Sequence, residues 1–151
     1  MCSSDLAHSE WQMRLDGYAQ KAEFQRRMAG ELPKDFSLDK YIKGLIDQPQ
    51  KVATRKASEM ALAEINTGLP ETIGGSADLT GSNNTKAGGI GPFTADDYSG
   101  RYVYYGIREF RMAAAMDGMA LHGRVIPYGG PFLVFPHPCR PPPSVSAPPR
   151  I

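Results

Sequence analysis

A run of mostly small residues, Gly74 to Asn83, constrains this sequence more than any other segment. It follows directly on Glu71-Thr72-Ile73, a short strand candidate, so its first two glycines stand where that strand is expected to end. Glycines at a strand end let the backbone approach a ligand closely, and the serines and threonine of the run add hydroxyl groups. The same residues also suit a plain tight turn in which Asp78 caps the next segment. Residue type alone leaves both interpretations open.

The segments after this run predict a parallel α/β sheet. In chain order they are a long loop at 81–100, a strand at Tyr102–Tyr105, a helix at Arg108–His122 that Gly123 ends, and a third strand at Val125–Tyr128. Strands separated by a helix and short links are typical of parallel sheets. Ligands of such sheets bind at the carboxyl ends of the strands, where both Gly74-Gly75 and Gly106 are expected to lie.

The residues before Val52 indicate a helical linker. Apolar side chains at three- and four-residue steps predict one helix from Ser9 to Glu31, which Leu32-Pro33 ends. A second, shorter helix is expected at Ser37–Asp47. From Thr54, which is expected to cap it, a third helix runs to Asn66–Gly68.

The two ends differ from the rest of the chain. Residues 1–8 carry no helical or strand pattern, and we interpret them as a leader foreign to the natural protein. From Pro136 to Ile151 the chain has seven prolines in sixteen residues. Such a run cannot form a helix or a central strand, because proline lacks the N–H donor and fixes φ.

Charge and cysteine content exclude several classes of protein. The chain has 17 basic and 16 acidic side chains and a formal net charge of +1, so no electrostatic surface for nucleic acid or an anionic membrane is expected. No apolar run approaches the roughly 20 residues that cross a bilayer. Cys2 and Cys139 have no paired spacing, which favours a reducing compartment and a cytoplasmic location.

A few side chains outside the small-residue run are candidates for chemistry. Glu109 begins a helix, where it is either a plain charge favoured by the helix dipole or a partly buried acid that exchanges a proton with a ring nitrogen. Arg55 is either solvated or a bidentate phosphate ligand. Phe132 and Phe135 either line a slot for an aromatic ring or fill the core.

Taken together, these residues resemble the transketolase family of thiamine-diphosphate enzymes. The segments that carry the resemblance are ATRKASE, LPETIGGSADLTGSN, DYSGRYVYYGIREF, MAAAMDGMALHG and PYGGPFLVF. It extends from about Ala19 to Phe135. The resemblance implies the following division: a linker at 9–51, and at 52–135 an incomplete parallel-sheet pyrimidine-binding domain of a thiamine-diphosphate enzyme.

The resemblance also implies roles for individual residues. Glu109 would bond N1′ of the aminopyrimidine and stabilise the imino tautomer, whose exocyclic nitrogen takes the proton from the thiazolium carbon. The other implied contacts are Asp78, Leu79, Phe132 and Phe135 with the cofactor, and Arg55 and Ser82 with the phosphate of the sugar substrate. The family's Mg²⁺ and diphosphate ligands belong to a diphosphate-binding domain that has no counterpart here, so no metal ligand is expected in this chain.

For the intact parent enzyme, the resemblance implies transfer of a two-carbon ketol unit between sugar phosphates. The donor would be xylulose 5-phosphate and the acceptor ribose 5-phosphate or erythrose 4-phosphate, in the pentose phosphate pathway, with a homodimer as the active form. Pro138 stands where the family has a tyrosine, so we interpret residues 136–151 as text from a shifted reading frame. The chain alone is expected to be inactive. The alternative is a non-catalytic truncated domain that binds a phosphorylated ligand or a partner protein.

Overall fold

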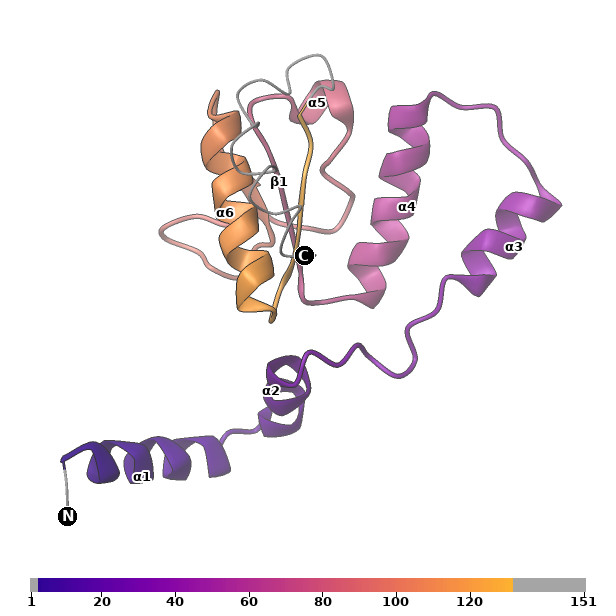
Figure 1. Ribbon diagram of the computed structural model, residues 1–151. Coiled ribbons are helices and arrows are strands. Elements are labelled where there is room, and N and C mark those ends of the chain that lie inside the picture. The colour runs from indigo at the N-terminus through magenta and orange to yellow at the C-terminus, as the bar shows by residue number, and fades with distance from the viewer. Residues whose placement is uncertain (1–2, 132–151) are drawn as a thin grey trace. The chain divides into compact units, whose positions relative to one another are not determined.

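A three-stranded parallel sheet, in the order β2-β1-β3, organises the chain from Pro33 onward. The structure, a computed structural model, describes residues 3–131 (Figure 1). Strand β1 (Thr72–Ser76) is central and pairs with β2 (Tyr102–Tyr104) and β3 (Ile126–Gly129) on its two sides. Gly74 lies opposite both Tyr102 and Tyr128. The predicted parallel α/β sheet is therefore confirmed.

Strand β1 runs through the glycines that were expected to follow it. Gly74 and Gly75 are buried inside the strand and pair with both neighbours. An added Cβ on Gly74 would collide with the ring of Tyr128, and one on Gly75 with the ring of Tyr105. The sequence interpretation of these glycines as a strand end was wrong. They lie inside the strand because the rings of Tyr128 and Tyr105 occupy the space that side chains at these positions would need.

Helices cover the two faces of the sheet. Helix α6 (Glu109–His122) packs on β3 and β1, and helix α4 (Thr54–Gly68) lies on the opposite side of β1 in Figure 1. Met112 and Ala113 are the buried residues of α6. Gly123 ends α6 in the left-handed conformation, with φ of 73°, as the sequence predicted.

The start of α4 differs from the prediction in one respect. Ala53 occupies the N-cap and Thr54 is the first helical residue, so Thr54 does not cap the helix. A shorter helix, α3 (Asp39–Asp47), precedes α4, and the Ser37 hydroxyl accepts a 3.0 Å hydrogen bond from the Asp39 amide at its start. The predicted helix at 37–47 is thus confirmed apart from its first two residues.

Residues 3–32 form a separate unit of two helices, α1 (Ser3–Asp16) and α2 (Lys21–Met28). The prediction of one helix from Ser9 to Glu31 was wrong, because the chain leaves the helix at Gly17, a residue that disfavours helix interiors by about 1 kcal/mol. The expectation that residues 1–8 carry no helical structure was also wrong, since α1 begins at Ser3. None of residues 4–32 is buried.

The loop between β1 and β2 contains a single helical turn that the sequence did not predict, α5 (Thr80–Asn83). Further along this loop, Ala87 and Ile90 pack with Tyr102 into a small core that Leu62 and Ala63 of α4 border. No helix within residues 3–131 is long and apolar enough to span a bilayer.

The two outer strands differ in how their free edges are protected. Along β2, the Phe93 amide donates to the Tyr102 carbonyl at 2.7 Å, and the Tyr102 amide donates to the Gly91 carbonyl at 3.1 Å. The segment around Pro92 therefore covers the outer edge of β2 with an isolated bridge. Strand β3 contains Pro127, which has no amide proton to donate.

Candidate functional site

The candidate site lies at the carboxyl edge of the sheet. Ser76 pairs with Tyr104, and Gly75 with Gly129, so the segments that leave the three strands emerge at the same edge. These segments begin with Ala77, Tyr105 and Gly130. Loops at this edge of a parallel sheet are the usual location of ligands.

The segment after β1 is a tight structure of unusual backbone conformation. Asp78 and Asn84, which flank the α5 turn on its two sides, both have positive φ, of 61° and 56°. Residues other than glycine seldom adopt this conformation, and it persists only where surrounding contacts hold it. The exposed Asp78 and the half-buried Leu79 therefore belong to a loop that is fixed from outside.

Arg55 and Ser82, which the resemblance assigns to the same sugar phosphate, lie in contact in the structure. Arg55 Nη1 donates to the Ser82 carbonyl at 3.2 Å, across 27 positions of sequence. Both residues line an open pocket of about 580 Å³. The other lining residues come from the start of α4, the α5 turn and the end of β3: Ala53, Thr54, Ser58, Asn83, Thr85, Gly129, Gly130 and Pro131.

The dipole of α4 makes the position of Arg55 informative. Arg55 lies in the first turn of α4, where a cation is electrostatically disfavoured and an anion is favoured. No acidic residue occupies that turn. An arginine at the positive end of a helix dipole, in an open pocket, is suited to an anionic group such as a phosphate.

Asn83 joins the α5 turn to the ends of two strands, a role that the sequence did not indicate. Its Nδ2 donates to the Ser76 hydroxyl at 3.2 Å and to the Gly130 carbonyl. Its Oδ1 accepts from the Thr85 hydroxyl at 2.8 Å. Ser76, which is fully buried, donates to the Gly130 carbonyl at 2.9 Å.

Tyr102 holds the same turn from β2. Its hydroxyl lies 2.9 Å from the Thr80 hydroxyl and 2.8 Å from the Thr85 hydroxyl, at the two ends of α5. Its side chain is fully buried. The sequence predicts Tyr102 only as a strand residue. A buried tyrosine usually has a hydrogen-bond partner, and this is the one signal that indicates such a contact.

Glu109 is the first residue of α6 and is half-buried, at the end of the segment that leaves β2. Gly106, three residues before Glu109, has a φ of 65°, so the backbone turns sharply between β2 and α6. The same segment carries Tyr105, whose burial raises its pKa above the usual value of 10.0. Glu109 thus stands at the edge of the sheet that also carries Asp78.

The described residues fit one part of thiamine diphosphate and not the other. A half-buried carboxylate at a helix start is a suitable acceptor for an N–H of an aminopyrimidine. A diphosphate needs a metal ion or cations, and residues 3–131 contain no group of three or more His, Cys, Asp and Glu side chains that can hold a metal. The predicted contacts Phe132 and Phe135 lie outside the described residues.

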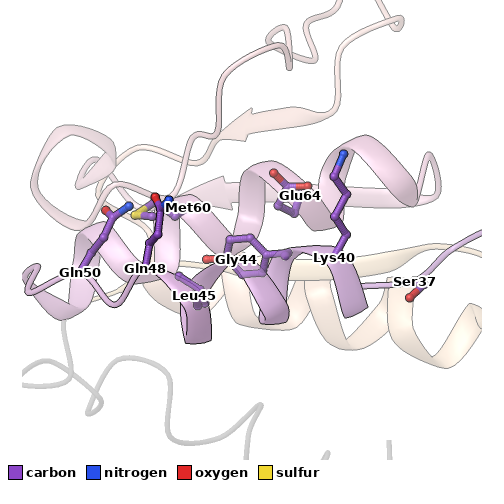
Figure 2. Close-up of a pocket in the computed structure, with 9 residues that line it drawn as sticks. Ser37, Lys40, Gly44, Leu45, Gln48, Gln50, Met60 and Glu64 are labelled. Carbon is purple, nitrogen blue, oxygen red and sulfur yellow. The ribbon is translucent and has the colours of Figure 1, made fainter.

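A second pocket lies away from this edge. Figure 2 shows it between α3 and α4, with a volume of about 470 Å³ and with Lys40, Gln48 and Glu64 among its lining side chains. It contains none of the residues predicted for the site.

Comparison with known proteins identifies the origin of this arrangement. The family model described as "Transketolase, pyrimidine binding domain" matches residues 50–145. A transketolase of Rhodobacter capsulatus is 53% identical over 131 residues, which are 84% of this chain and 20% of the relative. A transketolase of Cereibacter sphaeroides is 46% identical over 144 residues, 93% of this chain and 22% of the relative.

Solved structures agree. A transketolase of Pichia stipitis in complex with sedoheptulose 7-phosphate superposes with a TM-score of 0.81 at 41% identity, over 95% of this chain and 22% of that one. A transketolase of Leishmania mexicana gives a TM-score of 0.70 at 34% identity, over 87% of this chain and 20% of that one. The chain therefore spans about a fifth of the length of the proteins it matches.

Proposed function

Because this chain belongs to the transketolase family, we propose that it is part of an enzyme that transfers a two-carbon ketol unit between phosphorylated sugars. The donor is xylulose 5-phosphate and the acceptor ribose 5-phosphate or erythrose 4-phosphate. The proposal includes a homodimer as the active form and a cytoplasmic place in the pentose phosphate pathway.

The observation that carries this proposal is the meeting of Arg55 with Ser82 in one pocket. Arg55 stands at the positive end of α4, where it adds nothing favourable to the helix dipole. A doubly charged phosphate at this place would be attracted both by the arginine and by the positive end of the helix dipole. In the proposed enzyme, Arg55 and the Ser82 hydroxyl bind the phosphate of the sugar. This contact fixes how far the reacting end of the sugar lies from the phosphate site.

The proposal assigns cofactor contacts to the same edge of the sheet. Thiamine diphosphate, when bound, supplies the nucleophilic carbon that carries the two-carbon unit. Glu109 holds a proton between its carboxylate and N1′ of the pyrimidine, and Asp78 and Leu79 contact the cofactor from the α5 loop. Phe132 and Phe135 are proposed to pack on the pyrimidine ring, and the Mg²⁺ and diphosphate ligands are assigned to the diphosphate-binding domain of the parent enzyme.

A chimeric enzyme tests the proposal. Residues 50–131 of this chain would replace the matching segment of the Rhodobacter capsulatus transketolase, and ketol transfer from xylulose 5-phosphate to ribose 5-phosphate would be measured. We expect activity in the chimera and a loss of at least about 100-fold on Glu109→Gln, the usual scale for a group that exchanges a proton in catalysis. Glu64→Gln, on the exposed face of α4, is the matched control and should keep full activity. An unchanged rate in Glu109→Gln would contradict the assignment.

A second candidate function is phosphate binding by the chain on its own. The described residues that line the Arg55 and Ser82 pocket all belong to this chain, so we propose that phosphate binding needs no other domain. Catalysis does, and the purified 151-residue chain is expected to show no ketol transfer. Measurable turnover by this chain alone would refute that expectation.

A further inference from the structure

We infer that Tyr102 is a positioning residue for the phosphate pocket, through a directed hydrogen-bond chain that holds the α5 turn in place. Thr80, Tyr102, Thr85 and Asn83 make up this chain. The link to phosphate depends on the function proposed above for Arg55 and Ser82. The link to the conformation of α5 does not.

The direction of the chain follows from counting protons. Thr85 gives its single hydroxyl proton to Asn83 Oδ1, at 2.8 Å. In its 2.8 Å contact with Tyr102 it must therefore accept, so Tyr102 donates. Tyr102 then has no proton left for Thr80, and the Thr80 hydroxyl donates to it at 2.9 Å.

The far end of the chain is equally determined. Asn83 Oδ1 also accepts from the Thr85 amide at 3.3 Å, which fixes the orientation of the Asn83 amide group. Its Nδ2 then faces the Ser76 hydroxyl and the Gly130 carbonyl, both acceptors for it. Every donor from Thr80 to Gly130 points the same way, and hydrogen bonds aligned in this manner strengthen one another.

The α5 turn requires such a clamp. The turn lies between two left-handed residues, Asp78 and Asn84, a conformation that is unfavourable without support from outside. Its backbone hydrogen bonds close one turn only: the Ser82 and Asn83 amides donate to the Leu79 carbonyl at 2.9 and 3.0 Å, and the Asn84 amide donates to the Thr80 carbonyl at 3.1 Å. A single helical turn is not stable by itself.

The clamp reaches the pocket through the backbone of Ser82. The acceptor of Arg55 is the carbonyl of Ser82, one residue before Asn83. When Tyr102 and Asn83 hold α5, the Ser82 hydroxyl and the Arg55 guanidinium face one ligand together. Loss of the clamp separates them without removing either group.

The experiment uses the full 151-residue chain and two matched substitutions. Tyr102→Phe removes only the central hydroxyl of the hydrogen-bond chain. Tyr104→Phe is the control: it removes the hydroxyl of an exposed tyrosine in the same strand, which accepts a 3.0 Å bond from Lys86 and lies outside the clamp. Amide hydrogen exchange at Ser82 and Asn83 reports the turn, and inorganic phosphate titrated at constant ionic strength reports the pocket.

We expect Tyr102→Phe to speed exchange at both amides about tenfold and to weaken phosphate binding by about the same factor, with neither change in Tyr104→Phe. A merely structural role would lower the thermal midpoint and leave the phosphate affinity of the folded chain unchanged, and that result overturns the inference. Unchanged exchange at Ser82 and Asn83 overturns it as well. If the unsubstituted chain shows no saturable phosphate response, the proposed phosphate site falls, and the exchange data alone decide the clamp.

Thr80→Val provides a second variant if Tyr102→Phe does not fold. It removes the first donor of the chain and leaves the bond from Tyr102 to Thr85 in place. The expected changes are in the same direction and smaller. An effect larger than that of Tyr102→Phe would contradict the direction assigned to the chain.

Discussion

Two arginines stand near the two ends of helix α4, and they are used in opposite ways. At the carboxyl end of α4, Arg101 donates to the Asn66 carbonyl at 2.7 Å, to the Leu69 carbonyl at 2.9 Å and to the Thr72 hydroxyl at 2.8 Å. At the amino end, the exposed Arg55 donates to one acceptor within residues 3–131, the Ser82 carbonyl. The charge of Arg101 interacts favourably with the helix dipole, and the charge of Arg55 interacts unfavourably with it.

The difference separates a stabilising cation from a ligand-binding one. Arg101 satisfies the last carbonyls of α4 and ties them to the start of β1, so the amino edge of the sheet is locked by a charge. The carboxyl edge is held instead by the uncharged clamp of hydroxyls and the Asn83 amide. Neutral groups can fix the α5 turn without competing with Arg55 for a phosphate.

The largest expected effect comes from the amino edge. Arg101→Met should lower the free energy of unfolding by about 3 kcal/mol, because it removes charge-assisted hydrogen bonds to carbonyls that are partly buried. Urea unfolding followed by circular dichroism measures it. Arg111→Met, on the exposed face of α6, is the control and should change stability by less than about 0.5 kcal/mol. Equal effects of the two substitutions would remove the distinction between the edges.

Asn83→Ala should have the next largest effect, a loss of about 2 kcal/mol in the free energy of unfolding. The substitution leaves the buried Ser76 hydroxyl and the Gly130 carbonyl with fewer donors. The same urea titration measures it, and Asn84→Ala, outside this network, is unsuitable as a control because Asn84 is left-handed. Asn83→Gln, which keeps the amide on a longer side chain, is the better comparison: it should recover part of the loss, and recovery of none would argue against specific amide contacts.

Two tyrosines predict how alkaline pH acts on the fold. Burial raises the pKa of both Tyr105 and Tyr128 above 10.0, so the folded state keeps protons that the unfolded state releases. The stability that these phenols contribute is present below pH 10 and is lost as the pH rises through their folded pKa values. Tyr105→Phe and Tyr128→Phe should each flatten the fall in stability above about pH 10.

The same pair also differs at neutral pH. Tyr128→Phe loses the 3.0 Å bond from Asn66 and should cost about 1 kcal/mol, measured by urea unfolding. Tyr105 makes no side-chain hydrogen bond within residues 3–131, so its replacement should cost less. A steeper alkaline loss of stability in either variant would mean that folding lowers the pKa of that tyrosine, which contradicts the prediction.

Arg55→Met should have the smallest effect on stability, less than about 0.5 kcal/mol, and its sign can be favourable because a cation leaves the positive end of α4. In the same variant, added phosphate should no longer change the hydrogen-exchange rate of the Ser82 amide. This is the sharpest test of the comparison, since Arg101→Met should show the reverse pattern. A variant that loses stability and still binds phosphate would place Arg55 among the structural residues.

The sequence predicted the order of the elements well and the carboxyl edge only in part. The helix at 108–122 and its Gly123 end were predictable because apolar periodicity and a left-handed glycine are local signals. The extent of β1 was not, since Gly74 belongs to a strand only because Tyr128 fills its empty side. That contact joins residues 54 positions apart.

The candidate site shows the same division. Glu109, Asp78, Arg55 and Ser82 were singled out by a resemblance in residue type and order, and their roles stay predictions. The structure brings Arg55 into contact with Ser82, and only the resemblance, not any spacing in the sequence, had placed the two residues on one phosphate. Asn83 and Tyr102 were missed because their importance lies in bonds between loop, strand and turn, and such bonds leave no periodic pattern.

Because the two edges of the sheet differ, an additional strand would pair more readily with one edge than with the other. The Pro92 segment already bonds to the backbone groups of Tyr102. A strand from another copy of the protein therefore could not pair fully with the outer side of β2. Within residues 3–131 nothing pairs with the outer side of β3, and Pro127, which lacks an amide proton, interrupts that edge at one position only. Self-association of this chain through its backbone would therefore proceed from β3. If the unsubstituted chain self-associates on concentration, a charged side chain introduced on the outer edge of β3 should raise the concentration at which it does so.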